Sequence, residues 1–242
     1  KGQMDLRELS MKLNSTWEEY AKKQSEQKVI LEFDIGHLAM RGLSNESRFY
    51  DSLMIISQSV EIDSLDFHVS KDKNRPMPAQ VVKKDFSNML EALSFPVEID
   101  SLNIKNSKIT YSEIESGKTK AGVITLTDVN GLILNVSSIE AVEKENSLLI
   151  AIKAIFDGSG KLNLNVTENY FERKWIADLT LEAMDMKHLN QTVNHLAGIA
   201  IETGEIQKLH MKMEATATSS DNHFLMQYKD LKMELLNTED HK

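Results

Sequence analysis

The sequence VEIDSL occurs twice in this chain, at residues 60–65 and again, letter for letter, at residues 97–102. Its apolar and acidic residues alternate, which is the pattern of a strand with one buried face. Internal repetition is the sequence signature of an architecture assembled from similar units. The chain is therefore expected to consist of recurring β elements.

A weaker similarity links the two ends of the chain. Residues 4–9 (MDLREL) resemble residues 184–189 (MDMKHL), and residues 50–55 (YDSLMI) loosely resemble residues 228–233 (YKDLKM). We expect the chain to hold about one period of a larger array, with parts of the neighbouring repeats. The chain also begins at Lys1 rather than Met, as expected for a segment of a longer protein.

Composition narrows the classes of function. Of the 242 residues, 41% are hydrophobic and 27% are charged, which is typical of a globular protein. The net charge of -9 argues against nucleic-acid binding, because that affinity comes mainly from Lys and Arg at phosphates. Cysteine is absent, which excludes disulfides, thiolate metal sites and a Cys nucleophile. We find neither a signal peptide nor an apolar run long enough to span a bilayer.

Three segments have the apolar spacing of amphipathic helices. This spacing predicts helices over residues 5–20, 79–93 and 186–196. The middle segment lies in the window that holds all three prolines, so we expect a boundary or crossover there. The prolines are Pro76, Pro78 and Pro96.

Most other segments alternate apolar and polar residues, with turn residues between them. Strands are predicted at residues 29–38, 49–57, 59–69, 97–104, 108–114, 122–128, 131–137, 147–156, 161–167, 174–183, 206–217, 223–228 and 231–236. Turns are predicted at Asn106-Ser107, Ser116-Gly117, Asn130-Gly131, 157–160 and 167–169. Short, even connections are typical of antiparallel hairpins.

The fold class expected is mainly β with a few helices, an antiparallel meander in a curved or partly closed sheet. We divide the chain into four segments. They are the end of one β repeat with an N-terminal helix (1–78), an amphipathic helix or crossover (79–96), an antiparallel meander (97–183), and a helix plus strands that begin the next repeat (184–242).

Several strands have one strongly aliphatic face. We expect Leu132, Leu134 and Val136 on that face, with Ile133 and Asn135 opposite. The predicted helices are too few to cover such a face, so it is either a dry core or an open apolar groove. The candidate groove residues are Ile109, Tyr111, Leu132, Leu134, Val136, Leu148, Ile150, Ile152, Leu162, Leu164, Val166, Met211 and Met213.

The pattern resembles a known family. Residues 97–111 (VEIDSLNIKNSKITY) and 122–129 (GVITLTDV) are similar to a repeat of the AsmA-like envelope proteins, which pair the patterns I-D-x-L-x-I-x-N-G-x-I-x-Y and G-x-I-x-L-x-D/N-L. Ser107 stands where the pattern usually has Gly. The resemblance covers most of residues 97–236 and, more weakly, 29–70.

The resemblance implies a large protein anchored to the bacterial inner membrane by an N-terminal helix that lies outside this sequence. Most of such a protein lies in the periplasm as stacked β repeats with an apolar concave face. The partners implied are phospholipid acyl chains and neighbouring repeats, and the role implied is lipid homeostasis of the cell envelope. No cofactor, metal or nucleic acid is implied.

Two other functions stay open. One is a plain β-sandwich for binding or adhesion, with a dry core and no lipid role. The other is an enzyme, for which the chain offers no convergent motif. Gly117-Lys118-Thr119 lacks the first glycine of a phosphate-binding loop, no serine lies in a Gly-x-Ser-x-Gly elbow, and the histidines lack metal-ligand spacing.

Overall fold

The structure is a computed structural model, and it describes residues 2–47, 53–78, 90, 93–139, 146–216 and 218–236. The strands are β1 (Gly2–Met11), β2 (Val29–Leu43), β3 (Ile55–Asp72), β4 (Val97–Ile114), β5 (Gly122–Ser137), β6 (Ser147–Phe156), β7 (Gly160–Asn169), β8 (Lys174–Leu181), β9 (Met184–Asp185), β10 (Ile199–Ala215) and β11 (Ser220–Leu235). The helices are α1 (Trp17–Lys22), α4 (Asn190–Leu196) and the 3₁₀ turn η1 (Met186–Leu189).

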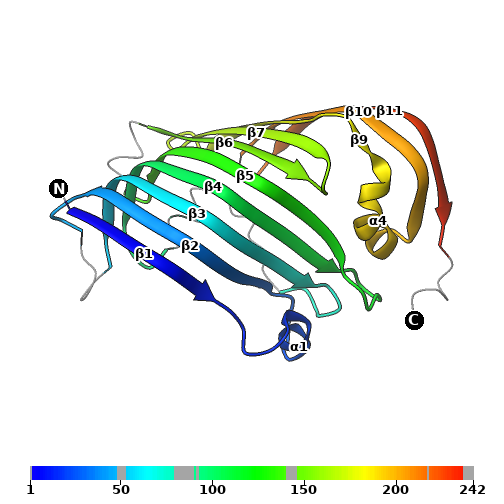
Figure 1. The fold of residues 1–242 in the computed structure, drawn as a ribbon, viewed down its shortest axis with the longest axis horizontal. Helices are drawn as coiled ribbons and strands as arrows, with labels where there is room; N and C mark the ends of the chain where they lie inside the picture. The colour runs from blue at the N-terminus through cyan, green and yellow to red at the C-terminus, as the bar shows by residue number, and fades with distance from the viewer. Residues whose placement is uncertain are drawn as a thin grey trace.

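All these strands belong to one curved sheet (Figure 1). Its order follows the chain from β1 to β8 and then passes to β10 and β11, with β9 paired beside β10. The predicted curved, mainly antiparallel meander is confirmed. The sandwich alternative requires two sheets packed face to face, and the described strands form a single one.

One pair of neighbours is parallel. β3 and β4 run in the same direction, and they carry the two copies of the repeated sequence. The copies are not aligned, because Val60 lies opposite Leu102 and Val97 lies opposite Ile55. The repeat therefore marks two similar strands side by side. The helix and crossover predicted at 79–96 lies mostly outside the described residues.

A line of irregular backbone positions crosses the first five strands. Four non-glycine residues, Glu8, Ser64, Asn106 and Asp128, have φ between 49° and 58°. Gly36 of β2 completes the line, since a Cβ on it would lie 3.1 Å from the Cβ of Ser64. The pairing of β4 with β5 shifts its register here, as at a bulge, whereas the pairings from β1 to β4 pass through the line without a shift. Such a position interrupts the regular alternation of side chains between the two faces. We call this line the crease.

Side-chain hydrogen bonds hold the crease together. The Asn106 amide Nδ2 donates to Asp63 Oδ1 at 2.9 Å, and this hydrogen bond lowers the pKa of Asp63. The Leu65 backbone N–H donates to the Ser107 hydroxyl at 3.1 Å. These bonds satisfy backbone and side-chain groups that a bulge takes out of the regular ladder.

The crease corrects several predictions. Asn106-Ser107 and Asn130-Gly131 were expected as turns, but they lie inside the continuous strands β4 and β5. In the family pattern residues 97–111 form a pair of strands, whereas here they belong to the single strand β4. The end of the predicted strand 49–57 likewise fuses with the predicted strand 59–69 into β3, and the predicted strands 223–228 and 231–236 fuse into β11.

The N-terminal helix predicted at residues 5–20 is wrong for its first half. The structure has β1 there, followed by the short helix α1, whose N-terminus is capped by the Thr16 hydroxyl. Leu6 and Leu9 share a face although they are three residues apart, because Glu8 between them has a left-handed backbone conformation with φ of 57°. This irregular position reproduces helical spacing within a strand. The helical segment predicted at 186–196 is confirmed as η1 and α4.

Candidate functional site

The candidate site is the apolar face on the inside of the curved sheet. Residues opposite one another on paired strands lie on the same face, so the register traces rows across the sheet. One row crosses ten strands and contains Leu6, Leu38, Ile62, Ile104, Gly131, Ile152, Leu164, Leu179, Met211 and Phe224. Every member of it is apolar or glycine.

A second row lies next to the first. It contains Met4, Met40, Val60, Leu102, Ile133, Ile150, Val166, Ala177 and Met213. The two rows together form a continuous apolar band, which we call the concave face. Three clusters of buried residues lie along this face. Val136 packs against two of them, and Leu164 packs against one of those two and against the remaining cluster, so the three clusters are connected.

The concave face stays apolar on both sides of the crease. On the far side a third row contains Met11, Phe33, Phe67, Ile109, Leu126 and Phe156. In β2 the residues on this face change from even-numbered Leu38 to odd-numbered Phe33. A strand with regular alternation would place these two side chains on opposite faces.

An open cavity of about 340 Å³ lies in the middle of the concave face. It is lined by Leu90, Leu102, Ile133, Val136, Leu148, Ile150, Ile152, Leu164 and Val166. All nine are aliphatic, with no polar or charged side chain among them. The volume falls within the range of small-molecule pockets, roughly 300–1,000 Å³. An aliphatic cavity of this kind suits a hydrocarbon and offers water no hydrogen-bonding partners.

Part of the concave face is covered by η1 and α4, which lie inside the curve (Figure 1). Met186 of η1 and Val193 of α4 pack on the apolar cluster there. Gly122 lets α4 approach β5, since a Cβ on it would lie 2.5 Å from Leu196 Cγ. The Thr192 hydroxyl donates to the Val123 carbonyl at 2.6 Å.

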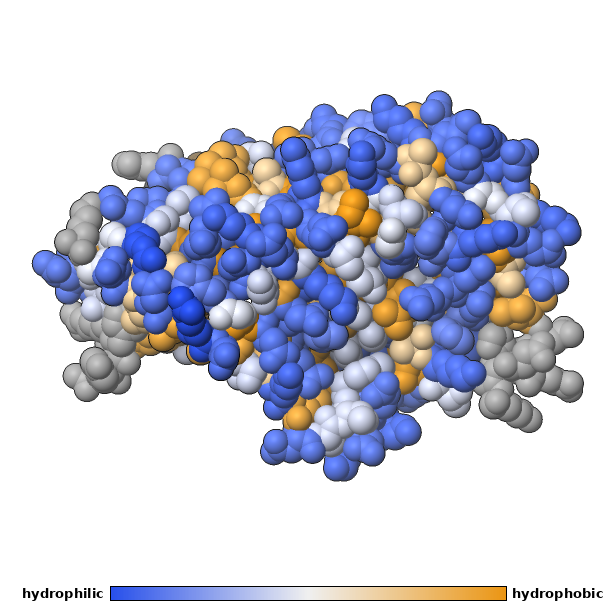
Figure 2. All heavy atoms as spheres, viewed as in Figure 1, coloured by the Kyte–Doolittle hydropathy of each residue, from blue (hydrophilic) through white to orange (hydrophobic). Residues whose placement is uncertain are grey.

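The cover does not reach the N-terminal strands. Met11 of the third row is exposed. Leu31 and Val29, which lie beyond Phe33 on β2, are exposed as well, Val29 by 60%. These residues share the concave face with Phe33 and Ile109. The described residues therefore leave an apolar surface open at these strands. Figure 2 shows that the side of the molecule turned to the viewer is mostly hydrophilic, with apolar residues in small groups.

The concave face ends in a polar group beside the β4–β5 hairpin. The Tyr111 hydroxyl donates to Glu113 at 2.6 Å, and Lys73 lies 2.7 Å from Glu113 and 3.0 Å from Glu115. Burial, together with this hydrogen bond to the carboxylate, raises the pKa of Tyr111 to about 12. The two glutamates hold the pKa of Lys73 above its usual value.

Most predicted groove residues lie on the concave face. These are Ile109, Tyr111, Val136, Leu148, Ile150, Ile152, Leu162, Leu164, Val166, Met211 and Met213. Six of them line the cavity. Their alternation within single strands was the signal that located them.

Two predictions differ from the structure. Leu132 and Leu134 lie on the opposite face, and Leu132 is 40% exposed. Ile133, predicted to face away, lines the cavity instead. The reason is Asn135, whose φ of 59° interrupts the alternation of side chains between Ile133 and Val136 without a shift of the register with β4. The two cavity residues are therefore three apart, and simple alternation from Val136 assigns the wrong face.

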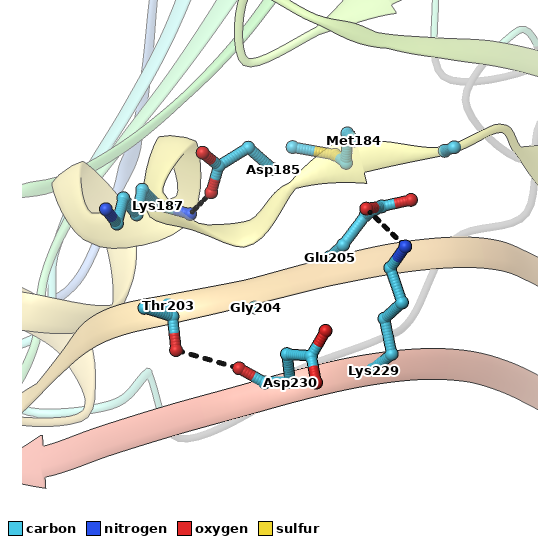
Figure 3. Close-up of a pocket in the computed structure, with 9 residues that line it drawn as sticks. Met184, Asp185, Lys187, Thr203, Gly204, Glu205, Lys229 and Asp230 are labelled. Atoms are coloured by element: carbon cyan, nitrogen blue, oxygen red, sulfur yellow. Dashed lines mark hydrogen bonds and ion pairs between the residues drawn. The ribbon is translucent and has the colours of Figure 1, made fainter.

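A second cavity, of about 480 Å³, has several charged side chains in its lining (Figure 3). Several of its labelled groups bond to one another: Glu205 pairs with Lys229 at 3.0 Å, and Asp185 accepts the Lys187 backbone N–H at 2.8 Å. The Thr203 hydroxyl donates to the Asp230 carbonyl. These bonds lie where β9, β10 and β11 bend, and they stabilise that bend.

Across the described ranges no three His, Asp or Glu side chains gather as a metal site. The described helices include none that is long and apolar enough to cross a membrane. No model of a known protein family matches the chain, and no curated protein matches it either.

Proposed function

We propose that this protein shields phospholipid acyl chains on its concave face, as a periplasmic segment of an AsmA-like protein that supports lipid homeostasis of the bacterial envelope. The observation that carries the proposal is the cavity lined only by Leu, Ile and Val on the concave face, which also has exposed apolar residues on β1 and β2. Neighbouring repeats and an inner-membrane anchor belong to the same proposal. The role is non-enzymatic and needs no cofactor.

Hydrocarbon transfer supplies the driving force. Each methylene removed from water gains about 0.8 kcal/mol, so six methylenes gain on the order of 5 kcal/mol before the costs of binding. The cavity is large enough to hold a segment of an acyl chain and open enough to let the headgroup stay in water. No bond has to form or break for such shielding.

Native mass spectrometry of protein purified without detergent tests the proposal. Phospholipid should stay bound and should dissociate at collision energies that leave the chain folded. Protein that is lipid-free when isolated from a phospholipid-rich envelope, and that takes up no lipid from vesicles, would contradict the proposal. Bound fatty acid without phospholipid would confine the role to single acyl chains.

A further inference from the structure

The concave face changes from apolar to charged beyond the third row. Residues opposite one another on paired strands share a face, so the register places this change on β3 and β4. The row that follows the third one contains Leu31, Val69, Tyr111 and Ile124, and the row after that contains Val29, Lys71, Glu113 and Gly122. Two charged side chains therefore stand at the end of the apolar surface that β2 leaves exposed.

Lys71 differs from its neighbour Lys73. Lys73 is held between Glu113 and Glu115, at 2.7 Å and 3.0 Å. Lys71 is half-buried and forms no ion pair with any residue that the structure describes. It lies close enough to Glu115 to help lower the pKa of that carboxyl, after the larger effects of the Ser116 backbone N–H and Lys73. The ammonium of Lys71 is therefore available to a ligand, next to an ionised carboxylate.

Glu115 also has capacity to spare. An ionised carboxylate has about four acceptor positions. Glu115 uses one for the Ser116 backbone N–H at 3.0 Å and one for Lys73, and its side chain is 36% exposed. The side chain of Glu113 is only 10% exposed, and both of its oxygens are engaged, by Lys73 and by the Tyr111 hydroxyl. Lys71 and Glu115 together thus offer a free cation and free acceptors side by side.

The charges of this group select the ligand. Lys71, Lys73, Glu113 and Glu115 sum to zero. A purely anionic group would meet Lys71 but would be repelled by two carboxylates, whereas a phosphate joined to an ammonium satisfies both signs. A primary ammonium donates N–H bonds to a carboxylate, which a quaternary one cannot do.

The distances along the strands fit the chains of one lipid. Lys71 and Phe67 are four residues apart on β3, which is about 13 Å. The chains of one bilayer leaflet span about 15 Å, half of the roughly 30 Å hydrocarbon core. Chains that start at Lys71 would thus end at the third row. The cavity residue Leu102 lies eleven positions before Glu113 on β4, about 36 Å away, so this lipid position is separate from the cavity.

We propose that Lys71 and Glu115 bind a phosphoethanolamine headgroup, with Lys71 Nζ donating to the phosphate and the Glu115 carboxylate accepting from the primary ammonium. The acyl chains of that lipid lie on the exposed apolar residues of β2 and on the third row. This inference rests on the proposed function, and it adds a headgroup class and a second lipid position.

Isothermal titration calorimetry with short-chain lipids tests the headgroup. Dihexanoyl phosphatidylethanolamine should bind the full chain with a Kd about fivefold lower than that of dihexanoyl phosphatidylglycerol, both used as monomers in solution. Fivefold corresponds to about 1 kcal/mol, the upper value for an exposed ion pair. Glycerophosphoethanolamine, which has no acyl chains, should compete with the first lipid, and inorganic phosphate at the same concentration should not. Equal affinities, a preference for the glycerol headgroup, or displacement by phosphate alone would overturn the proposal.

Three variants assign the contacts. Lys71→Ala should weaken both lipids by about fivefold, because both carry the phosphate. Glu115→Gln should weaken the ethanolamine lipid alone and so abolish the preference. Lys161→Ala removes a lysine from the other face of the sheet, where its side chain is 70% exposed, and should change neither affinity.

The outcomes separate this inference from the proposed function. Lipid that binds without a headgroup preference, or with a preference that Glu115→Gln leaves intact, would overturn the headgroup site and leave acyl-chain shielding in place. A chain that takes up neither lipid would contradict both.

Discussion

At the scale of single residues, the sheet owes its shape to side chains that tolerate a left-handed backbone. Asn, Asp and Ser can hydrogen-bond locally and so occupy such positions at lower cost than most residues. Asn106 and Asp128 lie at bulges of this kind in adjacent strands. They change which face the strand presents, and that change keeps both halves of the sheet apolar on the same side.

Replacing Asn106 tests this role. Asn106→Val should destabilise the protein by about 2 kcal/mol, because a β-branched residue is strained at positive φ and the bond to Asp63 is lost. Asn106→Gly loses the same bond without the strain and should cost less than about 1 kcal/mol. Urea unfolding measures both values. Equal losses would show that the backbone conformation contributes nothing.

Tyr111 gives a test by pH. Its pKa is raised to about 12 in the folded state, above the ordinary value of 10.0. The folded protein therefore keeps this proton longer than the unfolded chain, so the stabilising contribution is complete below pH 10 and is lost as the pH rises toward 12. Unfolding midpoints of the natural chain and Tyr111→Phe should converge over this window. A constant difference between them would contradict the assigned environment.

At the scale of elements, α4 matters because it covers only one part of the concave face. Gly122 is where it comes closest to the sheet. Gly122→Ala should destabilise the protein by about 1–3 kcal/mol through overpacking against Leu196.

The double variant Gly122→Ala with Leu196→Ala provides the control. Because Leu196 is the side chain that the new methyl group meets, the two losses should be less than additive. Thermal unfolding of the four proteins in the cycle measures the coupling. Fully additive losses would mean that α4 does not rest on Gly122.

The elements also show how far the sequence could predict the fold. Alternation located most strands and the helical spacing located η1 and α4, because both periods are local. The predicted strand ends were wrong where Asn-Ser or Asn-Gly lies at a bulge, since the same residue types are common in turns and in bulges. The parallel pairing of β3 with β4 depends on a long-range contact, which no local pattern in 55–72 or 97–114 encodes.

At the scale of the whole molecule, the curvature brings these elements together into one apolar face. The aliphatic residues of that face could be predicted from the sequence, apart from the strand in which Asn135 changes the phase. The cavity itself could not be predicted from the sequence, because its position depends on which part of the sheet α4 and Leu90 leave uncovered. The proposed lipid role concerns that uncovered part.

Crosslinking at two adjacent residues tests the central claim most directly. The chain has no cysteine, so a single one can be placed at Ile133, which lines the cavity, or at Leu132, on the other face of the same strand. Each variant is labelled with a photoreactive group, mixed with phospholipid vesicles and irradiated. The account predicts acyl-chain adducts at residue 133 and few at residue 132. Equal labelling of the two positions, or none at residue 133, would contradict it.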